Sequence, residues 1–381
     1  MSTRFMLNET SYFGRGAREE LAGELKKRNF KKVFLVSDKA LVSAGVAAKV
    51  EEVLKEAGMA YDLYDEIKPN PTIKNVTDGV EACKASGADV IVTVGGGSSM
   101  DTAKAISIVM TNPDRADIKS LNGLSNTKNR AMPVIALPTT AGTASEVTIN
   151  YVITDEDAEV KMVCVDPNDI PIVAIVDSEL MESMPKGLAA ATGMDALTHA
   201  VEGYITKAHN EMSDMFHIKA IKLIFKNLAS AVNEKEPYAV EQIGLAQYIA
   251  GMGFSNVGLG IVHSMAHQLG AVYDTPHGIA NAMLLPTVMR FNGENPETAQ
   301  RFREILCEIG RPDAAHLNDQ DVINTFELSK AVGITTTIKD YGAKEEDFEM
   351  LAEKAMNDPC KPGNPREVTK EQFVELYRKA M

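Results

Sequence analysis

The stretch "DVIVTVGGGSSMDTAK" (89–104) begins as a short apolar run, breaks into three consecutive glycines and continues in a helical pattern. An apolar run of this length bounded by glycine is typical of a buried strand. Glycines allow close approach of the backbone to a phosphate, and the N-terminus of the next helix offers unpaired N–H groups. The stretch predicts a strand–turn–helix unit that favours phosphate binding, although a plain turn has the same pattern and the spacing matches neither common phosphate-binding motif.

Similar short apolar runs occur on both sides of this unit. Strands are predicted at 31–38, 61–65, 133–140 and 171–177. Helical patterns lie between them, at about 43–57, 73–86 and from the glycines to about 110. Alternating strands and helices predict βαβ units and a mainly parallel sheet. Two more runs, 150–154 and 161–166, flank an acidic turn and predict an inserted hairpin.

The pattern changes after Asp177, where helical periodicities dominate. Helices are predicted at 189–206, 211–233, 238–253, 258–270 and 277–292, followed by several more. A chain of 381 residues is longer than one hydrophobic core usually organises. We therefore expect an α/β domain of parallel-sheet, dinucleotide-binding architecture in residues 1–182 and an all-α domain in residues 183–381.

The composition argues against some partners. The chain has 53 acidic and 39 basic residues, a formal net charge of −14, which disfavours a nucleic-acid or anionic membrane surface. The four cysteines form no CxxC pair and indicate reduced thiols. The beginning of the sequence has no apolar signal segment, and no apolar run approaches the roughly 18–20 residues of a membrane span. We expect a cytoplasmic protein without nucleic-acid or membrane partners.

Two further features of the first half are compatible with a dinucleotide. Asp38 ends the first strong strand, where a carboxylate can accept both hydroxyls of an adenosine ribose and repel a 2′-phosphate. The run "PTTAGTASE" (138–146) combines hydroxyl side chains with glycine and could contact a diphosphate or a nicotinamide ribose. A surface aspartate and a simple Ser/Thr-rich loop remain equally compatible with these residues.

A carboxylate and a histidine share one face of the predicted helix 189–206. Asp195 and His199 are four residues apart, and the only other charged residue of this helix is Glu202. So few charges predict a helix that is buried on all sides. A buried aspartate needs a cation, a metal ion or hydrogen-bond donors.

Three more histidines lie close together in the sequence. His263 and His267 are four residues apart within 242–273, a segment without a single Asp, Glu, Lys or Arg. His277 follows Thr275 and Pro276, which are typical of an N-cap and the first helical position. One carboxylate with imidazoles and no cysteine suits Fe²⁺ or Zn²⁺. Spacing alone does not rank His263 against His267, and the other three histidines, His209, His217 and His316, carry no functional prediction.

Five motifs together resemble the iron-dependent alcohol dehydrogenase family across essentially the whole chain. They are "GGGSSMDTAK" (95–104), "PTTAGTASEVT" (138–148), "DALTHAVEGY" (195–204), "HSMAHQLG" (263–270) and "DTPHGIANA" (274–282). The resemblance implies a dehydroquinate synthase-like fold. It also implies a homodimer that uses NAD(H) and Fe²⁺, with Zn²⁺ as an alternative ion.

The resemblance assigns roles to individual residues. The implied metal ligands are Asp195, His199, His263 and His277. His267 is implied as the catalytic residue that faces the substrate or relays protons, and Phe254 and Cys360 are implied to line the substrate pocket. The implied cofactor contacts are Asp38, Asn70, Gly96, Gly97, Ser98, Thr139, Thr140, Thr143, Asn150 and Lys161. Gln268 departs from the family's lactaldehyde-reducing members, which tend to have proline beside this histidine.

The implied reaction is hydride transfer between NAD(H) and a small primary alcohol or diol, with the metal ion as a Lewis acid. Lactaldehyde and 1,2-propanediol are the leading substrate pair. A broad-specificity alcohol or 1,3-propanediol dehydrogenase is the alternative within the family. A dehydroquinate synthase-type lyase is less compatible, because the uncharged segment 242–273 lacks cations for an anionic substrate. A non-enzymatic binding protein would leave the ligand set and the glycine-rich turn without a use.

Overall fold

The computed structural model describes all residues except 1–2, 159, 312–318 and 325. The chain divides into two compact units, Met1–Met184 and Pro185–Met381. This division lies two residues beyond the expected boundary between residues 182 and 183. His316, to which the sequence assigned no role, falls outside the described residues.

The first unit is built on a six-stranded sheet in which every pair of neighbouring strands is parallel. Its strands are, in spatial order, β1 (Thr10–Phe13), β9 (Val173–Val176), β6 (Val134–Pro138), β4 (Val90–Gly95), β2 (Lys32–Asp38) and β3 (Ala60–Ile67). The predicted parallel α/β architecture is confirmed. The sequence did not predict β1, which is four residues long and pairs with a strand about 160 residues later, so no local pattern marks it.

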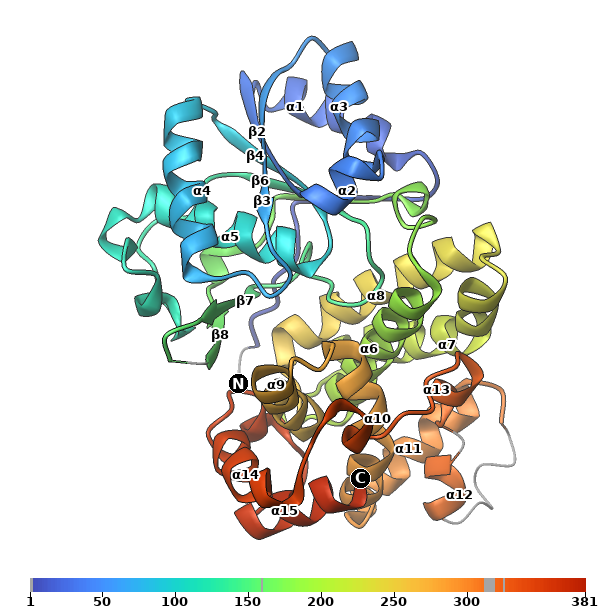
Figure 1. Cartoon of the computed structure of the whole chain (residues 1–381). Coiled ribbons are helices and arrows are strands. Elements are labelled where there is room, and N and C mark those ends of the chain that lie inside the picture. The colour runs from blue at the N-terminus through green and yellow to red at the C-terminus, as the bar shows by residue number, and fades with distance from the viewer. Residues whose placement is uncertain (1–2, 159, 312–318, 325) are drawn as a thin grey trace. The chain divides into compact units, whose positions relative to one another are not determined.

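Helices cover both faces of this sheet (Figure 1). Val33 and Leu35 of β2 share one core cluster with α1 (Glu20–Lys27) and α3 (Val46–Glu56). Phe34 and Val36 point the other way and pack with α4 (Ile73–Ser86) and α5 (Gly97–Thr111). Because successive side chains of a strand point to opposite faces of the sheet, β2 contributes residues to two apolar cores. The predicted helix 43–57 is instead two helices, α2 (Lys39–Ser43) and α3, because Gly45 between them adopts a φ of 75°.

A second, smaller sheet belongs to the same unit. The antiparallel strands β7 (Asn150–Asp155) and β8 (Val160–Val165) form the predicted hairpin. The two-residue strand β5 (Gly123–Leu124), which the sequence did not predict, pairs with β8 in parallel.

The second unit is helical in the described residues. Its α-helices are α6 (Lys186–Ile205), α7 (Glu211–Asn233), α8 (Pro237–Val257), α9 (Ile261–Tyr273), α10 (His277–Asn292), α11 (Pro296–Glu308), α12 (Asp319–Asn324), α13 (Leu328–Ala331), α14 (Phe348–Met356) and α15 (Lys370–Lys379). As expected, α6 is buried on nearly all sides from Ala190 onward. No single described helix is long and apolar enough to cross a membrane, and α8 and α9 pass that test only as a pair bent by 103°.

The predicted range of α10, 277–292, is confirmed, but its predicted N-cap is wrong by one position. Pro276, with an extended ψ of 128°, is the N-cap, and His277 is the first helical residue. Thr275 therefore does not cap the helix, and its buried hydroxyl has no hydrogen-bond partner in the described structure. The expectation that His277 opens this helix is nevertheless met.

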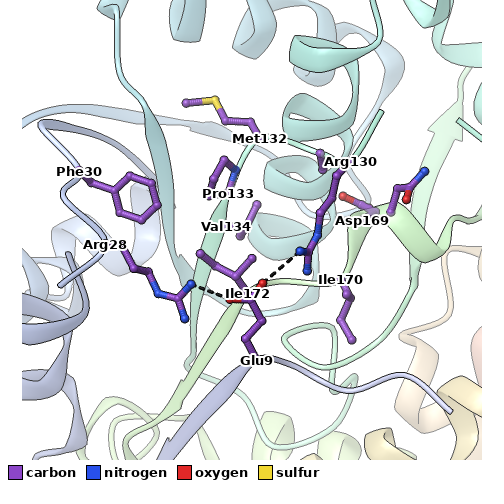
Figure 2. Close-up of a pocket in the computed structure, with 12 residues that line it drawn as sticks. Glu9, Arg28, Phe30, Arg130, Met132, Pro133, Val134, Asp169, Ile170 and Ile172 are labelled. Carbon is purple, nitrogen blue, oxygen red and sulfur yellow. Dashed lines mark hydrogen bonds and ion pairs between the residues drawn. The ribbon is translucent and has the colours of Figure 1, made fainter. Parts of the chain in front are cut away.

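A small cavity of about 170 Å³ lies by the amino ends of β6 and β9 (Figure 2). The carboxylate of Glu9 bridges two arginines beside it, at 2.6 Å from Arg28 and 3.0 Å from Arg130. The Arg28 hydrogen bond lowers the pKa of Glu9. These pairs tie the segment before β1 to the end of α1 and to the residues that lead into β6.

We predict that Glu9→Gln lowers the free energy of unfolding by at most about 1 kcal/mol, because Glu9 is 41% exposed and water screens the pairs. The folded pKa lies below the ordinary 4.5, so this contribution exists at neutral pH and is lost as pH falls below 4.5. Urea unfolding at pH 7 and pH 3.5 measures both. Glu52→Gln, on the exposed side of α3, is the control, and a Glu9→Gln effect that persists undiminished at pH 3.5 contradicts the assignment.

Candidate functional site

Three of the predicted cofactor segments meet at the carboxyl ends of adjacent strands. Asp38 ends β2, the glycine-rich turn follows β4, and Thr139 follows β6. The chain continues from β2 to β3 on one side and then adds β4, β6 and β9 on the other side, so the strand order reverses between β2 and β4. Open α/β sheets bind ligands outside the carboxyl ends of their strands at such a reversal.

The N-terminus of α5 lies at this edge of the sheet without a side-chain cap. Its N-cap is Gly96, which has no side chain that could accept from the first N–H groups of the helix. A Cβ atom on Gly97 would lie 2.8 Å from Cγ2 of Thr143, and one on Gly96 would lie 3.1 Å from Cγ2 of Thr140. The glycines therefore let the threonine-rich loop pack against the turn, which brings hydroxyls and free helix N–H groups together. Such an arrangement suits a phosphate.

The remaining cofactor candidates lie around the same edge. Asp38 accepts from the backbone N–H of Leu41 and caps α2, and Ser99 donates to its second oxygen at 3.4 Å. Ser98 is half-buried in the first turn of α5. Asn70 has a φ of 53° and accepts a 2.9 Å bond from Lys161 of β8. Asn150 begins β7.

Lys104 is a buried cation for which the sequence motifs predicted no role. Its Nζ donates to the carbonyl oxygens of Asn150 (2.6 Å), Thr148 (2.7 Å) and Ser145 (3.2 Å). Asp101, one turn earlier on α5, accepts from the Ser145 hydroxyl at 2.7 Å. These contacts fix the segment that follows the threonine loop. A Lys and an Asp three residues apart in an otherwise uncharged helix were the available signal.

The second unit brings the four predicted metal ligands together. Asp195 and His199 come from α6, His263 from α9 and His277 from the first turn of α10. Oδ1 of Asp195 lies 3.9 Å from Nδ1 of His199, 3.9 Å from Nε2 of His263 and 3.5 Å from Nε2 of His277. One donor atom from each residue lies within 4.8 Å of every other. The sequence placed Asp195 and His199 on one predicted helix, His263 on a second and His277 at the start of a third, and the fold makes them one cluster.

The cluster fits a single divalent ion. Tetrahedral ligands about 2.1 Å from an ion lie about 3.4 Å from one another, close to the observed separations. Nδ1 of His199 is buried and has no hydrogen-bond partner in the described structure. Burial holds the pKa of His263 well below its usual value, so this ring is a neutral imidazole that can offer a lone pair. A carboxylate and three imidazoles are donors that suit Fe²⁺ or Zn²⁺.

Asn281 lies one turn after His277 on α10 and contacts the same cluster. Its amide nitrogen donates to Oδ1 of Asp195 at 2.7 Å and lies 3.2 Å from Nε2 of both His263 and His277. The side chain is fully buried. Asn281 therefore helps to hold the Asp195 carboxylate in place, a role that its amide in "GIANA" did not reveal.

Different carboxylates contact the two histidines that spacing alone could not rank. Nδ1 of His263 lies 2.6 Å from Glu202, and its Nε2 is the atom that faces Asp195. Nδ1 of His267 lies 2.8 Å from Asp358, and its ring stacks on that of His277 at 5.4 Å. His267 is therefore next to the cluster but outside the four-residue ligand group.

Asp358 anchors the surroundings of His267. Burial alone would raise the pKa of Asp358. The contact with His267 and the hydrogen bond from the backbone N–H of Cys360 outweigh burial and lower this pKa below its usual value. Gln268 donates to Ser264 O at 3.1 Å and approaches Asp358 at 3.4 Å, so the residue that departs from the family joins this network. Nothing near Asp358 in the sequence indicated this contact.

Two other predictions concern aromatic and histidine side chains near the cluster. Phe254, predicted to line the substrate pocket, is buried with its ring stacked on His199 at 4.2 Å, where it supports a ligand. His217 is a buried core residue whose ring packs where Gly203 and Gly253 leave room, in keeping with its lack of a predicted role. Cys360 is half-buried beside Asp358.

The chain belongs to the iron-containing alcohol dehydrogenase family. The family model "Iron-containing alcohol dehydrogenase" matches residues 8–178, and "Fe-containing alcohol dehydrogenase family, C-terminal" matches residues 189–381. The lactaldehyde reductase of Escherichia coli (strain K12) is 50% identical, with 100% of each chain covered. The NAD-dependent methanol dehydrogenase of Bacillus methanolicus is 40% identical, also over 100% of each chain.

Solved structures of relatives share the fold. A crystal structure of a 1,3-propanediol oxidoreductase matches with a TM-score of 0.94 and 39% identity, covering 100% of both chains. The sulfoacetaldehyde reductase of Bifidobacterium kashiwanohense, solved in complex with NAD⁺, matches with a TM-score of 0.88 and 30% identity, covering 100% of this chain and 99% of that one. The iron-containing alcohol dehydrogenase fold, an α/β unit followed by a helical unit, is therefore established.

We predict that Lys104→Met lowers the free energy of unfolding by about 3–5 kcal/mol, because it removes one partner of a buried charged network. Three carbonyl oxygens would each lose a donor. Urea unfolding measures the change, and Lys84→Met, at a lysine whose side chain is 55% exposed, is the matched control. Equal and small losses for the two variants would show that Lys104 does not anchor this segment.

Proposed function

We propose that the protein is an NAD-dependent, iron-dependent oxidoreductase that interconverts a small primary alcohol or diol and its aldehyde. The convergence of Asp195, His199, His263 and His277 carries this proposal, because these side chains offer four donor atoms within 4.8 Å of one another in a member of this family. Lactaldehyde and 1,2-propanediol are the proposed substrate pair. Their support is the 50% identity to a lactaldehyde reductase over the full length of both chains.

Iron is the proposed ion, and zinc is the alternative with the same ligand preference. When bound, the ion supplies Lewis-acid polarisation of the alcohol or carbonyl oxygen. The four side chains hold it, and the described cluster contains no thiolate that would select a softer metal. Asn281 and Phe254 steady the carboxylate and one imidazole of the set.

His267 is the proposed group that holds and passes the proton of the reaction. Its Nδ1 is engaged by Asp358, which leaves Nε2 to exchange a proton with substrate or water. The His267 side chain is 11% exposed. In this pair the Asp358 carboxylate orients the His267 imidazole, as the carboxylate of a catalytic triad orients its histidine.

NAD(H) is the proposed cofactor, and it supplies or accepts the hydride. In the first unit, Asp38 would accept the adenosine ribose hydroxyls, and its charge would disfavour a 2′-phosphate. The N-terminus of α5 would bind the diphosphate, while Thr139, Thr140 and Thr143 contribute hydroxyls beside it. The NAD⁺ complex of a relative with a TM-score of 0.88 supports this assignment.

The proposal includes a cytoplasmic location and a homodimer. The location is supported by four free cysteines without a CxxC pair, which suit a reducing compartment. The homodimer is supported by membership of the iron-containing alcohol dehydrogenase family. Neither nucleic acid nor a membrane is a proposed partner, in view of the net charge of −14.

A 1,3-propanediol or broad-specificity alcohol dehydrogenase is the second candidate. The 39% identical 1,3-propanediol oxidoreductase structure and the 40% identical methanol dehydrogenase favour it. Comparison of kcat/KM for lactaldehyde, 3-hydroxypropionaldehyde and simple aldehydes separates the two candidates.

We predict that His277→Ala lowers both the bound metal content and NADH-dependent aldehyde reduction by more than about 100-fold, since it removes a proposed ligand rather than an outer partner. Metal analysis by mass spectrometry and NADH oxidation measure the two effects. His209→Ala, at a histidine of the α6–α7 loop, is the matched control and should retain both. Survival of metal binding and turnover in His277→Ala would refute the ligand assignment.

A further inference from the structure

Glu202 is a fully enclosed carboxylate that the proposed reaction does not use. It lies seven residues after Asp195 and three after His199, so all three side chains project from one face of α6. Its relative exposure is 2%. A charge buried this deeply requires strong partners, and all of its hydrogen-bond partners in the described structure belong to the beginning of α9.

Three backbone N–H groups and one imidazole nitrogen surround the two oxygens of Glu202. Oε1 accepts from the backbone of Val262 at 2.7 Å. Oε2 accepts from the backbone of Gly260 at 3.1 Å and of His263 at 3.4 Å, and it lies 2.6 Å from Nδ1 of His263. Backbone N–H groups only donate, so this side chain is required to accept at both oxygens. Ionised Glu202 can only accept, and in that state it places the ring proton of His263 on Nδ1.

The position of that proton decides what His263 offers on its other side. With Nδ1 protonated, Nε2 carries the lone pair. Nε2 is the atom 3.9 Å from Oδ1 of Asp195, within the four-donor cluster. The contact with Glu202 therefore sets both the tautomer and the direction of the ligand atom.

The same carboxylate replaces the missing cap of α9. Gly260 is the N-cap of this helix and has no side chain to satisfy the first N–H groups. A Cβ atom on Gly260 would lie 2.7 Å from Oε1 of Glu202. Glycine at this position is thus required by the approach of the carboxylate, and the beginning of α9 and the His263 ring share one anchor.

We propose that Glu202 is the positioning residue of the metal centre, which fixes His263 as the Nδ1–H tautomer, aims Nε2 into the cluster and ties ion affinity to the start of α9. This inference rests on the metal centre of the proposed function. Glutamine cannot replace Glu202 without loss, because its NH₂ group would face at least one of the three backbone N–H donors.

The test uses the full-length, metal-free protein and Co²⁺ as a spectroscopic probe. Equilibrium dialysis gives the Co²⁺ dissociation constant, and visible absorption of the saturated protein reports the ligand environment. We expect Glu202→Gln to bind Co²⁺ about 10–100-fold more weakly than wild type, as found when outer partners of metal-bound histidines are removed, and with a changed spectrum. Glu236→Gln is the matched control, since Glu236 also caps a helix, α8, through its side chain. Its Co²⁺ affinity and spectrum should equal those of wild type.

A second variant keeps the charge and moves the carboxylate. Gly260→Ala introduces a Cβ atom against Oε1 and should weaken Co²⁺ binding in the same direction, which tests the inference even where Glu202→Gln does not fold. Wild-type dissociation constants and spectra in both variants would overturn the role of Glu202 alone. Absence of Co²⁺ binding in the wild-type protein would instead overturn the metal centre, and the role of Glu202 with it.

Discussion

The burial of the Asp195 carboxylate among three imidazoles is the constraint on which the helical unit depends. Asp195 is 2% exposed and accepts a 2.7 Å hydrogen bond from Asn281. A carboxylate in such surroundings is costly unless a positive charge compensates it. Three helices, α6, α9 and α10, each contribute at least one donor atom to the cluster, so ion binding and the packing of these helices support one another.

Buried ionic groups position the chemistry in both units. In the first unit, Lys104 donates hydrogen bonds to three carbonyl oxygens in the segment that follows the threonine loop. The N-terminus of α5, which has no side-chain cap, is available for an anion. In the second unit, Glu202 and Asp358 each orient one histidine through Nδ1. Apolar packing builds the sheet and the helices, and these few polar contacts give the functional side chains their directions.

The sequence predicted what local patterns determine. The apolar runs of β2 and β4 and the hairpin of β7 and β8 carry their own periodicity, and the i,i+4 pair of Asp195 and His199 defines one helix face. Long-range contacts were not predictable in this way. The edge strand β1 depends on β9, and the partner of His267 lies 91 residues away, so the division of labour between His263 and His267 required the family resemblance.

We propose that one divalent ion bound by Asp195, His199, His263 and His277 is required for NADH-dependent aldehyde reduction. Metal content per chain after anaerobic preparation with ferrous iron, measured together with turnover before and after chelation, tests it most directly. We expect one iron per chain, loss of turnover when the ion is removed, and recovery when iron is returned. A protein that contains no divalent metal and still reduces aldehydes with NADH would contradict it.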